Sequence, residues 1–109
     1  MFDYIKGQIV NKKVDSVSLD INGIGYKIHI SLNTFEKIKE KECKLYIYNY
    51  IREDAYILYG FYDESEREFF EKLLSVSGVG AKLAIAILST YTVKDLKHII
   101  LNEDINLLI

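Results

Sequence analysis

Apolar and polar residues alternate with a period of two through much of the first 62 residues. Val17, Leu19 and Ile21 alternate with serine and aspartate, which is the pattern of a strand with one buried face. Strand patterns also cover four further segments, residues 2–10, 26–30, 43–51 and 56–62. Glycine inside a strand often marks an irregularity, so we expect Gly7 to lie at a bulge or bend of the first strand.

The breaks between these segments indicate how the strands are connected. Asn22–Gly23 is typical of a tight hairpin between the second and third strands. Ser31 or Asn33 can cap a short helix that ends near Ile38. Three strands, a short helix and two strands follow the order of the OB-fold, a five-stranded barrel with a helix between strands 3 and 4.

Beyond residue 62 the apolar residues recur at helical spacing. Asp63, with Glu66 three residues later, resembles a capping box at the start of a helix that we expect to end at Gly78. A second helix is predicted from about Ala81 to Ser89. We therefore predict an α+β protein, with an OB-fold barrel over residues 1–62 and a helix-hairpin-helix region over residues 63–109.

Two more helix starts follow in this region. Thr92, with Asp95 three residues on, is predicted to cap a third helix through Ile100 or Leu101, and residues 102–104 can start a fourth. The chain then ends on an apolar run, residues 107–109, without a polar cap or a stop signal. We therefore expect the sequence to be a fragment and the helical region to be incomplete.

The most informative stretch is residues 78–82, Gly-Val-Gly-Ala-Lys, which we call the glycine corner. Gly78 can adopt a positive φ, and Gly80 lets another molecule approach the backbone closely. The next helix begins with unpaired N–H groups and the positive end of its dipole, and Lys82 adds a full charge. An anion such as a phosphate is the expected guest, with Val79 fixing the corner to the core. The alternative is a plain glycine turn that binds nothing.

Other nucleotide or metal sites find little support in the sequence. A dinucleotide fingerprint would need a strand before the corner and a third glycine, where this chain has a helix and Leu83. The single cysteine, Cys43, excludes an internal disulfide, and two distant histidines argue against zinc. His29 is expected to be an exposed strand residue with no catalytic partner.

Composition narrows the class of protein further. Half of the residues are hydrophobic, and no apolar run approaches the roughly 18 residues of a membrane span. The N-terminal residues do not form a secretory signal. We expect a cytoplasmic protein without metal, cofactor or membrane contact. The net charge of −2 argues mildly against a uniformly basic surface for nucleic acid, but a backbone clamp needs few cations.

Tyrosine is concentrated in the last two predicted strands, at Tyr46, Tyr48, Tyr50, Tyr56, Tyr59 and Tyr62. Aromatic side chains on an OB barrel can stack the bases of single-stranded DNA. Alternating tyrosines are also good strand formers, and only Lys44 and Arg52 supply positive charge among them. We favour the structural interpretation and keep single-stranded DNA binding as an alternative function.

Several segments together resemble the RuvA family, whose members bind Holliday junctions in the bacterial branch-migration machine. These segments are residues 22–26, residues 52–55 with 58–61, and residues 77–88. The resemblance covers essentially the whole chain. Ala81 departs from the proline that often follows the second glycine in this family, but proline there is only a preferred first residue of the helix.

The resemblance implies roles for particular residues. Glu53 and Asp54 match two adjacent acids, the acidic pin, which repel phosphates at the junction centre and discourage binding of plain duplex. From the residues alone, this pair would be interpreted as a solvated turn. The glycine corner matches the first of two helix-hairpin-helix motifs that hold minor-groove phosphates. Arg52, beside the pin, is a candidate for an additional DNA contact.

The resemblance also implies an assembly. Family members are non-catalytic subunits that form one or two homotetramers around a four-way junction. They work with the hexameric ATPase RuvB and the resolvase RuvC in recombination, DNA repair and the SOS response. The second motif and the RuvB-binding domain would lie beyond Ile109. The enzyme alternative is a metal-dependent nuclease that uses Glu53 and Asp54.

Overall fold

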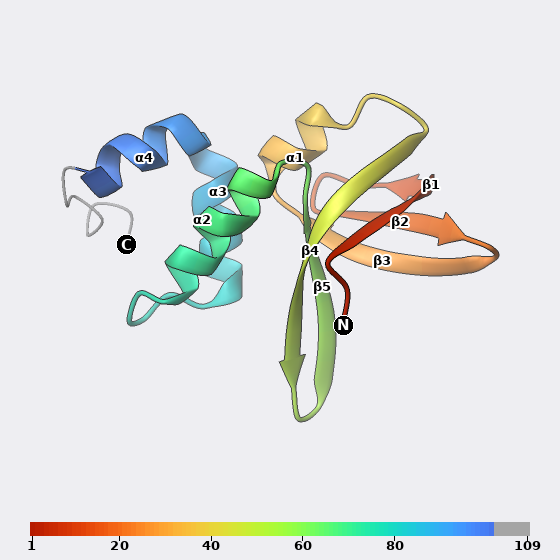
Figure 1. The fold of residues 1–109 in the computed structure, drawn as a ribbon, viewed down its shortest axis with the longest axis horizontal. Coiled ribbons are helices and arrows are strands. Elements are labelled where there is room, and N and C mark those ends of the chain that lie inside the picture. The colour runs from red at the N-terminus through yellow and green to blue at the C-terminus, as the bar shows by residue number, and fades with distance from the viewer. Residues whose placement is uncertain (102–109) are drawn as a thin grey trace.

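A computed structural model describes residues 1–101 of the chain (Figure 1). The elements in this range are β1 (Tyr4–Lys12), β2 (Ser16–Ile21), β3 (Ile24–Ile30), α1 (Leu32–Lys37), β4 (Glu42–Arg52), β5 (Ala55–Phe61), α2 (Glu64–Leu74), α3 (Ala81–Thr90) and α4 (Val93–Leu101). The predicted order of three strands, a short helix, two strands and then helices is confirmed. The helix predicted to start at residues 102–104 lies outside the described residues.

The five strands close into a barrel in the order β1-β2-β3-β5-β4, and β4 pairs back onto β1. This is the predicted OB-fold barrel. Closure depends on the parallel pairing of β3 with β5, where Ile30 lies opposite Gly60. A Cβ on Gly60 would lie 2.4 Å from the side chain of Ile28 and 3.2 Å from that of Leu45. Glycine is therefore what allows the two strands to meet this closely.

The hairpin between β2 and β3 forms as Asn22–Gly23 predicts. Both residues have positive φ, 54° and 84°, as a two-residue type I′ turn requires. The Gly23 N–H also donates to the carboxylate of Asp20 at 2.9 Å. The local sequence is sufficient to specify this turn.

Of the bulge or bend expected at Gly7, the bulge lies elsewhere in β1. The register of β1 against β2 shifts between Ile9 and Asn11. A Cβ on Gly7 would lie 2.8 Å from the carbonyl oxygen of Asp20 and 2.8 Å from the side chain of Ile21. The glycine therefore serves a close approach between neighbouring strands, and the irregularity lies further along β1.

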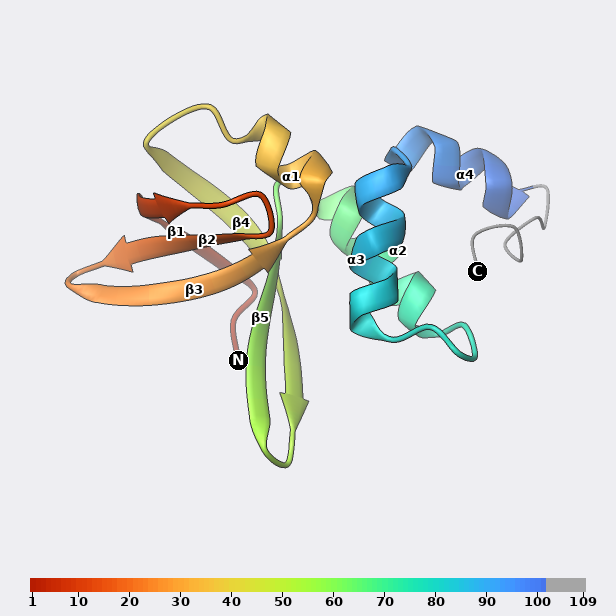
Figure 2. The ribbon, with the colours of Figure 1, turned by 180° about the vertical axis from the view of Figure 1, so that it is seen from behind.

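Two hydrophobic clusters hold the described residues together. One fills the barrel and includes Leu19, Ile28 and Leu45, all fully buried. The other lies between β4 and β5 and the helices α2, α3 and α4, and its ring contacts converge on Phe70. Figure 2 shows α2 and α3 side by side next to the barrel. The helices thus pack on the outside of the two strands that carry most of the tyrosines.

Ring contacts support the structural interpretation of three tyrosines. The ring centroids of Tyr48 and Tyr59 lie 5.1 and 5.2 Å from that of Phe70, and Tyr50 stands edge-on to Tyr59 at 6.0 Å. Such contacts add to the burial of these rings between barrel and helices. Contacts within the chain therefore account for the placement of these rings.

A buried carboxylate joins α1 to α2. Glu66 is 2% exposed, and its two carboxylate oxygens accept hydrogen bonds from the hydroxyls of Ser31 at 2.8 Å and Thr34 at 2.6 Å. Burial, the largest influence, raises the pKa of Glu66, and the two hydroxyl donors oppose that rise. The predicted capping box was therefore wrong, because Asp63 caps α2 without a side-chain bond and instead pairs with Lys37.

The other helix ends show what the sequence predicts well and poorly. Ser31 is the cap of α1, accepting from the Thr34 N–H at 3.1 Å. Thr92 and Asp95 bond each other's backbone N–H groups, so the predicted start of α4 is confirmed. The predicted end of α2 at Gly78 was wrong, since the helix stops at Leu74. No helix within residues 1–101 is both long and apolar enough to cross a membrane.

Candidate nucleic-acid interface

The two glycines of the glycine corner differ in conformation. Gly78 has φ +85°, which side chains rarely adopt, so the turn itself requires glycine there. Gly80 has φ −92° and ψ 178°, which any residue can adopt, and a Cβ on it would meet no heavy atom within 4 Å. Nothing inside the described chain requires glycine at position 80. The open space beside its backbone is available to another molecule.

Gly80 is also the N-cap of α3, and no side chain caps this helix. The first turn contains no acidic residue, and Lys82 lies in it with an exposed side chain. The N–H groups of a first helical turn have no intrahelical acceptor, and they carry the positive end of the helix dipole. The start of α3 is therefore an open site for an anion.

Val79 and Ala81 hold the corner in place. Each is 8% exposed and belongs to the cluster between barrel and helices. The Val79 N–H donates to the carbonyl of Val76 at 3.1 Å, which closes the turn from α2. The expectation that Val79 fixes the corner to the core is confirmed. The apolar residue points inward and leaves the two glycines outside.

The second candidate region is the turn that joins β4 to β5, which we call the hairpin tip. Arg52 pairs with Ala55, so Glu53 and Asp54 form a two-residue turn, and both are exposed. Neither has a positive φ, unlike Asn22 and Gly23. Figure 1 shows the hairpin as a long arm whose tip lies at the lower edge of the view, while the connection between α2 and α3 lies higher, on the left.

The tip presents negative charge to solvent. No hydrogen bond or ion pair joins Glu53 or Asp54 to any other residue in the range 1–101. Arg52 does not neutralise them, because its guanidinium lies 3.9 Å from the ring centroid of Tyr50 and donates to the Ile51 carbonyl at 2.9 Å. Two carboxylates thus stand at the end of the arm with an arginine folded back beneath them.

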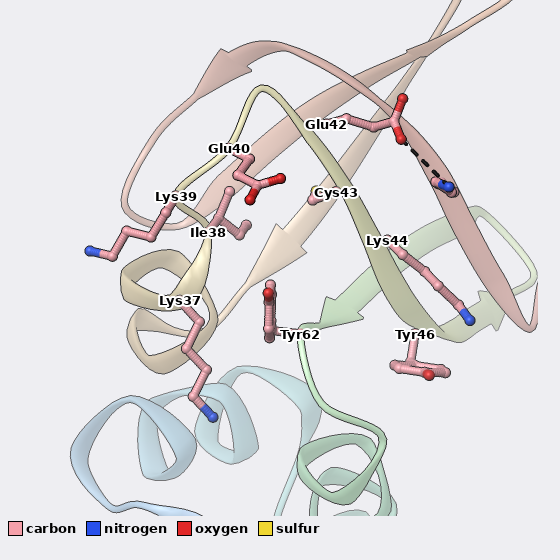
Figure 3. Close-up of a pocket in the computed structure, with 10 residues that line it drawn as sticks. Lys37, Ile38, Lys39, Glu40, Glu42, Cys43, Lys44, Tyr46 and Tyr62 are labelled. Atoms are coloured by element: carbon pink, nitrogen blue, oxygen red, sulfur yellow. Dashed lines mark ion pairs between the residues drawn. The ribbon is translucent and has the colours of Figure 1, made fainter.

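A separate lysine-lined hollow of about 610 Å³ lies between α1, β1 and β4 (Figure 3). Two of its four lysines, Lys6 and Lys37, form ion pairs. Lys6 pairs with Glu42 at 3.5 Å, and Lys44 lies over the rings of Tyr4 and Tyr46 at 4.4 and 5.0 Å. These contacts leave the hollow with less attraction for an anion than its lysines suggest.

The alternative functions find less support in this geometry. Among the described residues, no three histidine, cysteine, aspartate or glutamate side chains come together to hold a metal ion. For single-stranded DNA, the exposed tyrosines of the last two predicted strands are Tyr56 and Tyr62, at 52% and 42%. They lie at opposite ends of β5, so they do not form a continuous stacking surface.

Sequence reasoning missed two features near the candidate sites. Glu66 was assigned to a cap, although it shares helical spacing with Phe69, Phe70 and Leu73, a signal that could have placed it on the buried face. His29 was expected to be exposed, but it is partly buried, with its ring 5.8 Å from that of Tyr59. No local signal identifies this contact, because Tyr59 lies on a strand thirty residues away.

Comparison with protein families matches both parts of the chain. Residues 1–60 match the RuvA N terminal domain, and residues 70–108 match a SAM-like helix-hairpin-helix tandem. The two matches follow the barrel and the helices in order.

Curated relatives extend the similarity over nearly the whole chain. Proteins named Holliday junction branch migration complex subunit RuvA are 50% identical over 109 residues in Bacteroides fragilis, 46% over 110 residues in Clostridium tetani and 45% over 105 residues in Fusobacterium nucleatum. These alignments cover 99%, 99% and 95% of this chain but 54%, 56% and 54% of the relatives. The chain thus spans about half the length of the curated relatives it matches.

Proposed function

The chain belongs to the RuvA family, and on that premise we propose that it forms the DNA-holding part of a subunit that binds four-way junctions for branch migration. The role is structural and not catalytic. Specificity comes from the shape of the branched DNA and not from base edges. In this proposal residues 1–62 form the barrel domain and residues 63–109 belong to the DNA-binding helical domain.

The observation that carries the proposal is the conformation of Gly80. Its backbone is unstrained and its missing side chain leaves open space, directly in front of the uncapped start of α3. A phosphate there would accept from backbone N–H groups and lie near the Lys82 ammonium. Backbone donors contact phosphates without reading sequence, which suits a protein that must hold any junction.

The hairpin tip supports the proposed selectivity for branched DNA over linear duplex. Glu53 and Asp54 would act as the acidic pin, placed at the junction centre by the β4–β5 arm. Their charges are not compensated within the described chain, so they repel phosphates that approach the tip. A junction can open around such charges, whereas a duplex crossing the same point brings its phosphates against them.

The proposal includes partners. We infer assembly as a homotetramer, or two tetramers, so that several copies grip the arms of one junction. RuvB as the ATP-driven motor and RuvC as the resolvase are the expected partners, with action in the cytoplasm. The names of the relatives, which call each a subunit of a branch migration complex, support a multi-protein assembly.

A competition experiment on the full-length protein tests this function. A labelled four-way junction is displaced by unlabelled junction, by linear duplex of equal length, or by oligo-dT, at a fixed salt concentration. We expect unlabelled junction to compete best and oligo-dT worst. Preferential displacement by oligo-dT would favour the single-stranded alternative.

The same reaction with added magnesium separates binding from cleavage. The labelled junction should remain intact, because the proposed role needs no chemical step. Cleavage that disappears when Glu53 and Asp54 are replaced by amides would favour the nuclease alternative. Cleavage that persists in that variant would point to a contaminating nuclease. Further purification of the protein should then remove the cleavage.

A further inference from the structure

A small hollow of about 220 Å³ lies between α3 and the barrel strands β3 and β5. It is lined by Asp15, His29, Ile30, Ile57, Tyr59, Lys82 and Ile85. Lys82 belongs both to this lining and to the glycine corner. Lys82 is therefore common to the hollow and to the proposed phosphate site.

His29 provides a hydrogen-bonding group on the barrel side of this hollow. No hydrogen bond to either of its ring nitrogens occurs within residues 1–101. No buried side-chain nitrogen or oxygen in that range lacks a partner, so the nitrogens of this partly buried ring must reach solvent. A ring held against Tyr59 with a free nitrogen is a ready donor for a ligand in the hollow.

The charges around His29 come from several elements. Lys27 lies on its own strand, Asp15 on the β1–β2 connection, Tyr59 on β5 and Lys82 on α3. Burial, followed by Lys27, lowers the pKa of His29, while Asp15 raises it less. The free protein therefore carries a neutral imidazole near pH 7, beside two lysines and one carboxylate. A bound dianion or phosphodiester would favour the protonated ring.

We propose that this hollow receives a second backbone phosphate of the DNA strand held at the glycine corner, with Lys82 and His29 as its ligands. Phosphates follow one another along a strand, and Lys82 belongs both to the first turn of α3 and to the lining of the hollow. The phenolic O–H of Tyr59 is a third donor on the same wall, and burial raises its pKa so that it stays protonated. The inference rests on the proposed function, because it adds a second phosphate contact to the one proposed at the glycine corner.

The test is the pH dependence of junction binding by the full-length protein. Affinities are measured at pH 6 and pH 8 at equal ionic strength for the wild type, His29→Gln and His98→Gln. His98, on α4, is the other of the two histidines in the chain and serves as the matched control. Because binding takes up a proton on His29, the wild type should bind about threefold to tenfold more tightly at pH 6.

His29→Gln should lose that gain while His98→Gln keeps it. The salt slope at pH 6 should also fall by about one in His29→Gln, since one cationic phosphate contact disappears. Equal pH dependence in wild type and His29→Gln would overturn the inference while leaving the proposed function intact. Absence of junction binding at both pH values would instead overturn the proposed function.

A direct titration keeps the inference testable if His29→Gln does not fold. The pKa of the His29 ring is followed by NMR in the wild type, free and bound to junction. It should rise on binding. A His29 pKa that stays constant or falls would contradict a phosphate in the hollow.

Discussion

The hairpin tip and the glycine corner are both short turns at the surface, yet they present groups of opposite charge. The tip extends two paired strands and presents two carboxylates. The corner has no carboxylate in its following helical turn and presents bare backbone N–H groups. In the proposed function, one repels phosphate and the other attracts it, and their spacing would select a DNA shape.

The two regions also differ in how they are held. The tip is fixed by the strand ladder itself, so its position follows from β4 and β5. The corner depends on tertiary contacts, with Val79 in the core and Glu66 joining α2 to α1. Changes in the helical packing should therefore move the corner while the tip stays in place.

The largest expected effect comes from Glu66→Ala, which breaks the link that holds the corner to the barrel. The hydroxyls of Ser31 and Thr34 would lose their buried acceptor, at a cost of about 3 kcal/mol in unfolding free energy. Glu64→Ala is the control, because the Glu64 side chain is exposed and its contact with Arg67 at 3.7 Å should contribute about 0.5 kcal/mol. Urea denaturation of both variants measures the difference. Equal stability of the two would show that Glu66 does not hold the helices.

The pH dependence of stability provides a second test of this residue. The folded pKa of Glu66 is raised, so the folded state binds more protons than the unfolded state above the unfolded pKa. This residue's contribution is fully present below the unfolded pKa and is lost as pH rises through the folded pKa. Glu66→Gln should flatten that part of the stability profile. A profile identical to wild type would contradict the raised pKa.

Next in size is Gly80→Asp, which should convert the attractive turn into a repulsive one. Aspartate is a favoured N-cap and the φ and ψ of Gly80 suit it, so the fold should keep or gain stability. Its carboxylate would occupy the N–H groups and repel a phosphate, weakening junction binding by about 2 kcal/mol, roughly 30-fold. Gly25→Asp is the control, since a Cβ there also meets no atom within 4 Å. Similar affinity losses in both variants would refute the clamp.

A smaller change is expected from removing the charge of the tip. Glu53→Gln with Asp54→Asn should raise duplex affinity more than junction affinity, shifting their ratio by about 1 kcal/mol, or fivefold. The shift should be largest at low ionic strength, where screening is weakest. Paired titrations of wild type and double variant measure the ratio. A ratio that does not move toward duplex would remove the pin role.

The smallest effect is expected for Lys82→Ala. One phosphate contact disappears, so the slope of log affinity against log salt should decrease by about one, with a modest loss of affinity. Lys94→Ala, on the more distant α4, should leave the slope unchanged. If both lysines changed the slope equally, binding would be governed by overall charge and not by the corner.

Features were predicted correctly from the sequence where the interacting residues are close together along the chain. The Asn22–Gly23 turn and the Thr92–Asp95 cap were predicted because each is decided within four residues. The order of strands and helices along the chain was predicted from the change between strand and helix periodicity. The roles of individual candidate residues in DNA binding stay predictions.

What sequence reasoning missed depends on distant partners. Glu66 fits a capping pattern locally, but hydroxyls more than thirty residues away bind it instead. Gly7 was assigned to a bulge or bend because the approach of Asp20 and Ile21 cannot be inferred from its neighbours. The corner was recognised from its glycines, whereas the hollow beside it needed the placement of α3 against β3.

The parallel pairing of β3 with β5 at Gly60 has a consequence for how the chain folds. Each antiparallel hairpin can form from neighbouring residues, but barrel closure must bring residues 28–30 to residues 58–60. Contacts this far apart in sequence pay the loop-closure entropy before any gain, so closure is expected to be a late and slow step. Until then β3 and β5 each keep an unpaired edge, and the nascent chain is most exposed to misassociation. A side chain at position 60 would obstruct this closing contact, because its Cβ would lie 2.4 Å from the side chain of Ile28.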